Sequence, residues 1–157
     1  MSTLRFARNK IVGVEQPDAS TYLVHGVLED TIYALDIDLE VRSPGLEITS
    51  IEGKYRRYTT TECPKSIPKL QNAVGLSIAD KEFARKVRRV VGREGCTHFA
   101  NLLIECCDGV MQAAAYGDWK KLKESGQAPE RDAYLAEKFQ TMPGLKGSCL
   151  AYSGRGG

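Results

Sequence analysis

Two cysteines stand where the sequence predicts the start of a helix. Cys63 directly precedes Pro64, a residue typical of a first helical turn, and Cys96 follows Gly95 before a long segment with helical apolar periodicity. The unpaired N–H groups and the dipole of a helix N-terminus favour a thiolate, which is the nucleophilic and metal-binding form of cysteine. Cys63 and Cys96 are therefore the first candidates for chemistry.

His98 lies two residues beyond Cys96, close enough at a helix start for both side chains to turn toward one point. If the two helix starts converge, Cys63, Cys96 and His98 supply three soft ligands, the number found in open zinc sites. Cys149, in a glycine-containing loop near the C-terminus, is the candidate fourth ligand. The cofactor expected on this interpretation is zinc or an iron–sulfur cluster.

The same residues support a second interpretation, in which Cys96 is a nucleophile and His98 its general base. The other candidates are better explained structurally. Cys106 falls on the apolar stripe of a predicted helix, His25 lies in the middle of a predicted strand, and Asp30 occupies a predicted turn. The sequence contains no phosphate-binding loop, dinucleotide fingerprint or nucleophile elbow.

Length and composition describe a folded protein. The 157 residues fit one domain, and 42% apolar with 27% charged residues is ordinary for a globular chain. Twenty-two basic against 20 acidic side chains argue against a broad nucleic-acid-binding surface. We also see no signal peptide or apolar run of membrane-spanning length, so we expect a cytoplasmic protein that binds no membrane. A protein partner or a small molecule remains the expected ligand.

In the first third of the chain, apolar residues recur at every second position, which is the period of a β-strand. Leu35, Ile37, Leu39 and Val41 alternate with acidic residues, as in a strand with one buried face. Further strands are expected at residues 4–14, 22–28 and 46–51. The period becomes helical after residue 62, which predicts helices at residues 64–75, 77–92, 97–116 and 129–139 and one more turn at 119–123. Strands followed by helices predict one α+β domain over 1–157, with an antiparallel meander of three to four strands and four helices on one face.

The helix boundaries rest on particular residues. Gly75, Gly92 and Gly117 are expected to end the first three helices, and Ser77 with Asp80 resembles a capping box. The residues expected to be buried in the first two helices are Ile67, Leu70, Val74, Ile78, Phe83, Val87 and Val90. Those expected to be buried in the last two are Phe99, Leu102, Leu103, Cys106, Val110, Ala114, Tyr134, Leu135 and Phe139.

Several runs resemble a bacterial family of uncharacterised proteins with a Gly-Cys-Thr-His-Leu signature. The resemblance rests on Gly95-Cys96-Thr97-His98-Phe99 with Leu102-Leu103, and on the upstream runs Asp30-Thr31, Cys63-Pro64 and Val74-Gly75-Leu76. It extends over about residues 5–152. This resemblance implies no particular activity.

A more distant resemblance is to iron–sulfur scaffold proteins of the NifU/IscU and SufE type, which place a small antiparallel sheet before helices. Cys63 matches the scaffold cysteine after the last strand, and Cys96 matches the one at the start of a long helix. The adjacent scaffold histidine is displaced here by two positions, to His98, and Asp30 stands nearest to the missing Cys-Gly-Asp motif. The resemblance implies a cluster scaffold or, as in SufE-type proteins, one sulfur-accepting cysteine.

Two functions follow from these observations. The first is a carrier or scaffold-like protein that binds a metal, an iron–sulfur cluster or transferred sulfur through Cys63, Cys96 and His98. The alternative is a small thiol-dependent enzyme that attacks an acyl compound or another electrophilic small molecule with Cys96, with His98 as the base.

Overall fold

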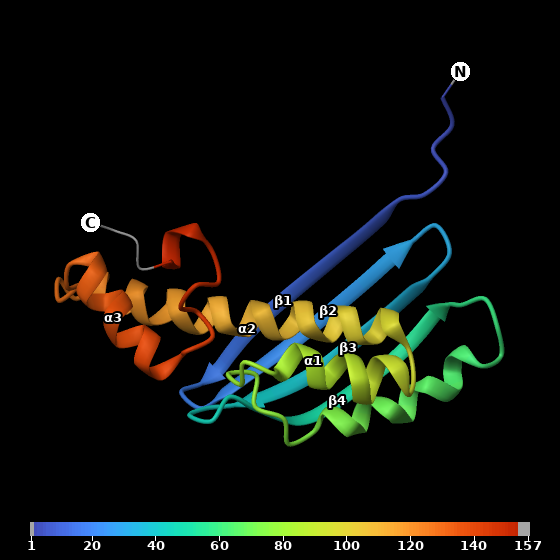
Figure 1. Ribbon diagram of the computed structural model, residues 1–157, viewed down its shortest axis with the longest axis horizontal. Coiled ribbons are helices and arrows are strands. Elements are labelled where there is room, and N and C mark those ends of the chain that lie inside the picture. Colours follow the sequence, from blue (N-terminus) through green and yellow to red (C-terminus); the bar gives the residue numbers. More distant parts are fainter. Residues whose placement is uncertain (1, 154–157) are drawn as a thin grey trace.

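A computed structural model describes residues 2–153. Its N-terminal half is a four-stranded antiparallel sheet in the order β1-β2-β3-β4 (Figure 1). The strands are β1 (Arg8–Asp18), β2 (Thr21–Asp30), β3 (Ala34–Arg42) and β4 (Glu47–Arg57). The predicted meander is confirmed, and β1 lies about four residues further along the chain than the expected 4–14.

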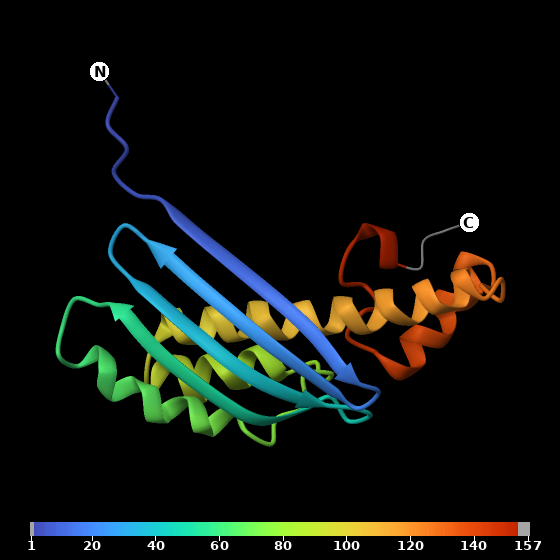
Figure 2. The same ribbon diagram turned by 180° about the vertical axis from the view of Figure 1, so that it is seen from behind.

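The helical elements follow the sheet in the chain. They are η1 (Cys63–Ala73, a 3-10 helix), α1 (Phe83–Val87), η2 (Arg88–Arg93, a π-helix), α2 (Thr97–Glu124), α3 (Arg131–Thr141) and η3 (Leu150–Tyr152). The elements η1, α1, η2 and α2 cover one face of the sheet, whose other face is bare when seen from behind (Figure 2). The α+β fold with helices on one face is therefore confirmed. The second half of α2 extends past the sheet and lies beside α3 (Figure 1).

The alternating residues of β2, β3 and β4 form the core together with α2. Leu35, Ile37 and Val41 are completely buried, while Asp38 on the opposite face is exposed. The sheet and α2 approach very closely at Gly26, where an added Cβ would lie 2.3 Å from the Cys106 sulfur. A glycine at this position is therefore needed for the packing of the helix on the sheet.

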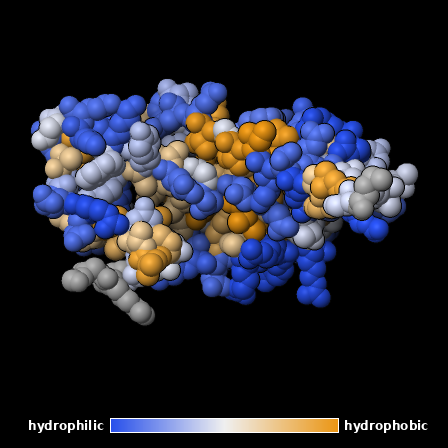
Figure 3. All heavy atoms as spheres, turned by 90° about the horizontal axis from the view of Figure 1, so that it is seen from above, coloured by the Kyte–Doolittle hydropathy of each residue, from blue (hydrophilic) through white to orange (hydrophobic). Residues whose placement is uncertain are grey.

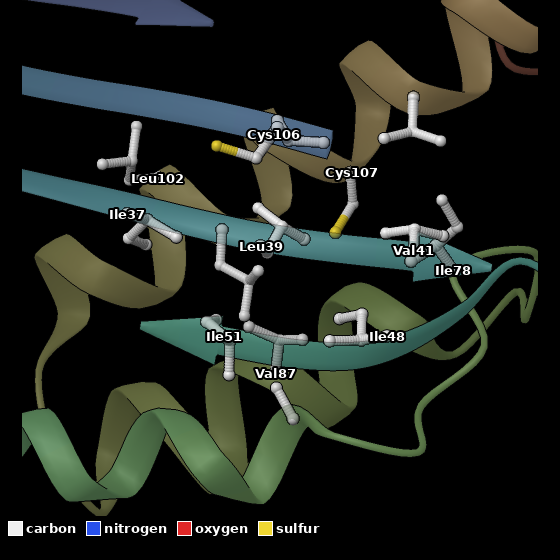
Figure 4. Close-up of a cluster of buried hydrophobic side chains, with 14 of the residues drawn as sticks. Ile37, Leu39, Val41, Ile48, Ile51, Ile78, Val87, Leu102, Cys106 and Cys107 are labelled. Carbon is white, nitrogen blue, oxygen red and sulfur yellow. The ribbon is translucent and has the colours of Figure 1, made fainter. Parts of the chain in front are cut away.

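Cys106 and Cys107 are both buried between α2 and the sheet (Figure 4). Burial raises the pKa of Cys106 to about 12, and it also raises that of Cys107. The structural interpretation of Cys106 is confirmed, and Cys107 belongs to the same core.

Helix α2 is longer than predicted, because Gly117 does not end it. The helix runs to Glu124, and Gly126, with φ +69°, adopts the left-handed conformation typical of a helix end. The expected separate turn at 119–123 is part of α2. Gly117 keeps helical geometry since a glycine inside a helix costs only about 1 kcal/mol relative to alanine.

Val90 and Val74 differ from prediction because the local helices are not α-helices, and Ile67, Leu135 and Phe139, also expected to be buried, are half-buried. Val91 rather than Val90 is fully buried, since the wider turn of π-helix η2 shifts the buried stripe by one residue. In the 3-10 helix η1 the buried residues are Ser66, Leu70 and Ala73, and Val74, which follows the helix in extended conformation, is exposed.

The predicted capping box at Ser77 is wrong. The hydroxyl of Ser77 donates to the carbonyl of Gly45 (2.7 Å), and Ser77 forms an isolated bridge with Glu47 of β4. Asp80 instead accepts the backbone N–H of Glu82 (2.8 Å), just before α1 begins. The segment after η1 therefore extends the edge of the sheet before it becomes helical.

The surface seen from above is largely hydrophilic and carries a hydrophobic patch near its middle (Figure 3). Among the large apolar residues, Ile11 of β1 and Leu23 of β2 are exposed. No helix within residues 2–153 is long and apolar enough to cross a membrane.

Candidate functional site

Four chain segments meet at one end of the sheet. Arg8 at the start of β1 lies opposite Asp30 at the end of β2, and Ala34 at the start of β3 lies opposite Arg57 at the end of β4. Helices η1 and α2 both begin at this end of the sheet (Figure 1). The antiparallel topology therefore brings the two predicted cysteine positions to the same end of the molecule.

Cys96 and His98 form a thiol–imidazole pair at the start of α2. Cys96 is the N-cap residue, with an extended backbone (φ −137°, ψ 123°), and its N–H donates to the carbonyl of Val91 (2.9 Å). Its sulfur lies 3.7 Å from Nδ1 of His98, within the reach of a hydrogen bond to sulfur. Both side chains are half-buried, so solvent still reaches them. This pair is the central geometric feature of the site.

His98 packs against the ring of Tyr33, with 4.1 Å between the ring centroids and 35° between their planes. Burial lowers the pKa of His98; the nearby Arg8 charge lowers it further, and the Asp30 carboxylate acts in the opposite direction. The imidazole is therefore uncharged at neutral pH. In the tautomer that carries its proton on Nε2, Nδ1 is free to accept the proton of the Cys96 thiol.

The buried carboxylate of Asp30 orders the turn that carries Tyr33. It accepts the backbone N–H groups of Ile32 (2.7 Å) and Tyr33 (2.5 Å) and both Nε and a terminal nitrogen of Arg8 (2.9 and 2.6 Å). Burial alone would raise the pKa of Asp30, but the Tyr33 N–H, Arg8 and the Ile32 N–H together lower it to about 2. Asp30 is thus a charged anchor of the site at neutral pH.

Tyr55 is a second neighbour of the Cys96 thiol. Its ring packs edge-on against Phe99 of α2 (4.8 Å between centroids), and its hydroxyl lies 3.2 Å from Oγ of Ser66. Burial raises the pKa of Tyr55, and its contact with the Cys96 thiol raises it further. Because Ser66 donates its proton to the carbonyl of Cys63 (2.7 Å), the Tyr55 hydroxyl donates to Ser66. Tyr55 thus connects the start of η1 with Cys96.

Cys63 is the first residue of η1 and is half-buried. The hydroxyl of Thr60, 3.5 Å from its sulfur, lowers the pKa of Cys63; burial opposes this, and the backbone N–H groups of Thr60 and Thr59 support it. Both Cys63 and Cys96 act electrostatically on the hydroxyl of Tyr55. The structure thus brings Cys63, Cys96 and His98 to the same end of the sheet.

Cys149 does not join this group. It is exposed and lines a cavity together with Asp108 and Trp119 of α2, and Asp108 lies about 18 Å along the helix axis from Cys96. Within residues 2–153, no three or more His, Cys, Asp or Glu side chains are placed so that they could hold a metal ion. The four-ligand set expected from the sequence is therefore not assembled.

Sequence reasoning did not identify Arg8, Tyr33 and Tyr55 as parts of the site. All three come from strand ends or a turn, where basic and aromatic residues are common, and only the tertiary contacts show that they lie near the start of α2. His25 lies outside the site, on the bare face of the sheet, where its Nδ1 is 2.7 Å from Oδ1 of Asp38. Its structural interpretation agrees with this contact.

The comparisons with known proteins give a family and no named relative. No curated protein and no solved structure matches the chain. Nothing in the comparisons supports a relationship to iron–sulfur scaffold proteins. The family described as "Protein of unknown function (DUF2889)" matches residues 14–112, well over half of the chain, including Cys63, Cys96 and His98 but not Cys149. The chain therefore belongs to this family of proteins of unknown function, as the resemblance to an uncharacterised family indicated.

Proposed function

We propose that the protein performs thiol chemistry at Cys96, with His98 as the base that takes the thiol proton. The observation that carries this proposal is the 3.7 Å approach of the Cys96 sulfur to Nδ1 of an imidazole whose pKa is lowered by burial. A neutral imidazole beside a thiol is the arrangement that general-base activation of a cysteine requires. The reactant is an acyl compound or another electrophilic small molecule that reaches the half-buried sulfur from solvent.

The reaction with an acyl compound proceeds in balanced steps. The Cys96 sulfur attacks the carbonyl carbon and forms the S–C bond, while the thiol proton passes to Nδ1 of His98. Collapse of the tetrahedral intermediate breaks the bond to the leaving group, which takes that proton from His98 and departs. Water or a second acceptor then cleaves the thioester and restores the thiol.

Neighbouring groups hold the base in place for this step. The ring of Tyr33 packs on His98, and the turn containing Tyr33 is fixed by the buried carboxylate of Asp30. An imidazole held by packing loses little rotamer freedom when the reactant binds, which favours proton transfer. Tyr33 and Asp30 are therefore positioning residues in this proposal.

The test is the rate at which a small excess of iodoacetamide alkylates Cys96 at neutral pH, followed by peptide mass spectrometry. We expect Cys96 to react faster than the exposed Cys149, and His98→Gln to lower the Cys96 rate about tenfold or more, since general-base assistance contributes at least this much. His25→Gln is the matched control, because His25 is the other histidine of the chain. Equal Cys96 rates in the wild type and His98→Gln would contradict the proposal.

A carrier of transferred sulfur is the second candidate, and the position of Cys63 and Cys96 at the same end of the sheet, both acting electrostatically on Tyr55, favours it. The Cys96 thiolate would take a sulfur atom with its proton from a donor persulfide, forming Cys96 persulfide and releasing the donor thiolate. Zinc or an iron–sulfur cluster at Cys63, Cys96 and His98 has less support, since the described side chains do not form a three-ligand group.

Analysis of metals, of acid-labile sulfide and of the sulfane sulfur released by a reductant, in anaerobically purified protein, separates these carriers from the enzyme. Sulfur, zinc or iron present in near-stoichiometric amount, lost in Cys96→Ser and retained in the control Cys149→Ser, would support a carrier. Absence of all three from the wild type would leave the thiol-enzyme proposal as the only one supported.

We also infer a cytoplasmic location. All five cysteines are free thiols. Free thiols persist in a reducing compartment, whereas oxidising compartments favour disulfides. Quantification of free thiols in protein alkylated at the moment of cell lysis tests this inference, with five free thiols expected for each chain.

A further inference from the structure

A cavity of about 690 Å³ lies at the opposite end of α2 from the thiol site. Its walls come from the second half of α2, from α3 and from the segment before and within η3. Figure 1 shows α3 alongside this part of α2, beyond the edge of the sheet. The volume falls in the range of small-molecule sites, about 300–1,000 Å³. Nearly all of the wall lies outside residues 14–112, the part of the chain that matches the family.

Fixed aromatic rings form one wall. Trp119 of α2 and Tyr134 of α3 meet edge to face, with 4.9 Å between their centroids. The hydroxyl of Tyr134 donates to the carbonyl of Ala115 (2.7 Å), which fixes its ring. Tyr116 and Tyr152 also line the cavity. Rigid aromatic walls of this kind suit a planar ring, because aromatic pairs attract each other beyond the burial of their area.

Two cationic side chains of α3 line the same cavity. They differ in how many hydrogen-bond donors remain available to a ligand. Lys138 is mostly buried, and its ammonium contacts the carboxylate of Asp118, which neutralises its charge. Arg131 donates one terminal nitrogen to the carbonyl of Ala151 (3.2 Å) and lies 3.7 Å from the exposed carboxylate of Asp132. A guanidinium has five N–H donors, and an exposed ion pair contributes little, so Arg131 keeps donors for an anion.

We propose that this cavity binds an aromatic small molecule that carries an anionic group. The aromatic part packs against Trp119 and Tyr134, and the anionic group, a carboxylate, sulfonate or phosphate, pairs with Arg131. This site lies at the other end of α2 from the thiol site and does not depend on the chemistry proposed for Cys96.

Trp119 is the only tryptophan of the chain, so its fluorescence reports directly on the cavity. The probe is 1-anilinonaphthalene-8-sulfonate, an anionic aromatic dye, titrated into the full-length protein. We expect saturable quenching of Trp119 emission with one dye per chain. Arg131→Gln should weaken binding about tenfold, or by about 1.4 kcal/mol, because it removes the charged hydrogen-bond donor to the sulfonate.

Three comparisons make the test specific. Arg93→Gln removes the same charge from the exposed end of η2 and should bind the dye like the wild type. N-phenyl-1-naphthylamine, which has the same rings without the sulfonate, should bind the wild type and Arg131→Gln equally. Ala115→Phe, which fills the cavity from α2, should abolish quenching by both dyes, while circular dichroism confirms that each variant is folded.

Two results would overturn the proposal. One is quenching that does not saturate or that persists in Ala115→Phe, which would place the dye on another surface. The other is equal affinity of the sulfonated dye for the wild type and Arg131→Gln. That result would show that Arg131 does not bind the anionic group.

Discussion

At the scale of single residues, Asp30 links the sheet to the candidate site. Its side chain is fully buried, and its hydrogen bonds hold Arg8 and the turn of Tyr33, which in turn packs on His98. A buried carboxylate is stable only when donors surround it, as they do here. A change at Asp30 should therefore affect both stability and the orientation of the base.

We predict that Asp30→Asn lowers the free energy of unfolding by about 2 kcal/mol, the contribution of hydrogen bonds to a charged acceptor. The pKa of Asp30 is lowered to about 2 in the folded state, against about 3.9 for an unfolded chain. Its contribution is therefore complete above about pH 4 and is lost as the pH falls toward 2. Urea unfolding at several pH values measures this.

The control for Asp30 is Asp38→Asn, a change at an exposed carboxylate on the bare face of the sheet. Between pH 4 and 2 the wild type should lose more stability than Asp30→Asn does, whereas Asp38→Asn should follow the wild type. The same loss in Asp30→Asn as in the wild type would show that Asp30 does not anchor the fold.

At the scale of elements, the packing of α2 on the sheet determines where the thiol site forms. The closest approach is at Gly26 of β2, where an added Cβ would also meet Leu102 at 3.3 Å. We predict that Gly26→Ala costs about 1–3 kcal/mol of stability, the usual effect of overpacking a core. Chemical denaturation measures this cost, and Gly13→Ala is the matched control because an added Cβ there meets nothing within 4 Å.

A double variant identifies the cause of that cost. Cys106→Ala removes the sulfur that the new methyl group would contact, so Gly26→Ala should cost less in the Cys106→Ala background than alone. Additive effects of the two substitutions would mean that the cost arises elsewhere, for example from a change in strand geometry.

The sequence predicts the elements better than their ends. The alternation of Leu35 to Val41 and the apolar period after Thr97 were sufficient to locate β3 and α2. The π-helix η2 and the continuation of α2 through Gly117 were not predictable, because both depend on tertiary packing that overrides local preference. The shift of the buried position from Val90 to Val91 is the direct consequence.

The candidate site was predicted in part for a related reason. The cysteines and His98 mark helix starts, which local sequence signals reveal. Tyr55 enters the site through the register of β4, and Tyr33 enters it through the packing of its turn on His98; a single sequence specifies neither. Cys149 was assigned to the wrong end of the molecule because the direction taken by the chain after α3 leaves no local signal.

At the scale of the whole molecule, α2 separates two distinct regions. The thiol site lies at its first turn, and the aromatic cavity lies around Ala115, about 25 Å further along the helix axis. Changes at sites so far apart are expected to act independently. The two proposals can therefore be tested in the same protein without interference.

We predict that Tyr134→Phe lowers stability by about 1 kcal/mol, because it removes the hydrogen bond to the carbonyl of Ala115. The alkylation rate of Cys96 should not change. Urea unfolding and peptide mass spectrometry measure the two quantities on one preparation, and a slower Cys96 reaction in this variant would show that the two ends of α2 are coupled.

The most direct test of the central claim is the pH dependence of Cys96 alkylation. If His98 takes the thiol proton, the rate should rise with pH through an inflection below pH 6.5, since burial lowers the pKa of His98 from that value. The inflection should be absent from His98→Gln and present in His25→Gln. A profile that is the same in the wild type and His98→Gln would show that His98 does not activate Cys96.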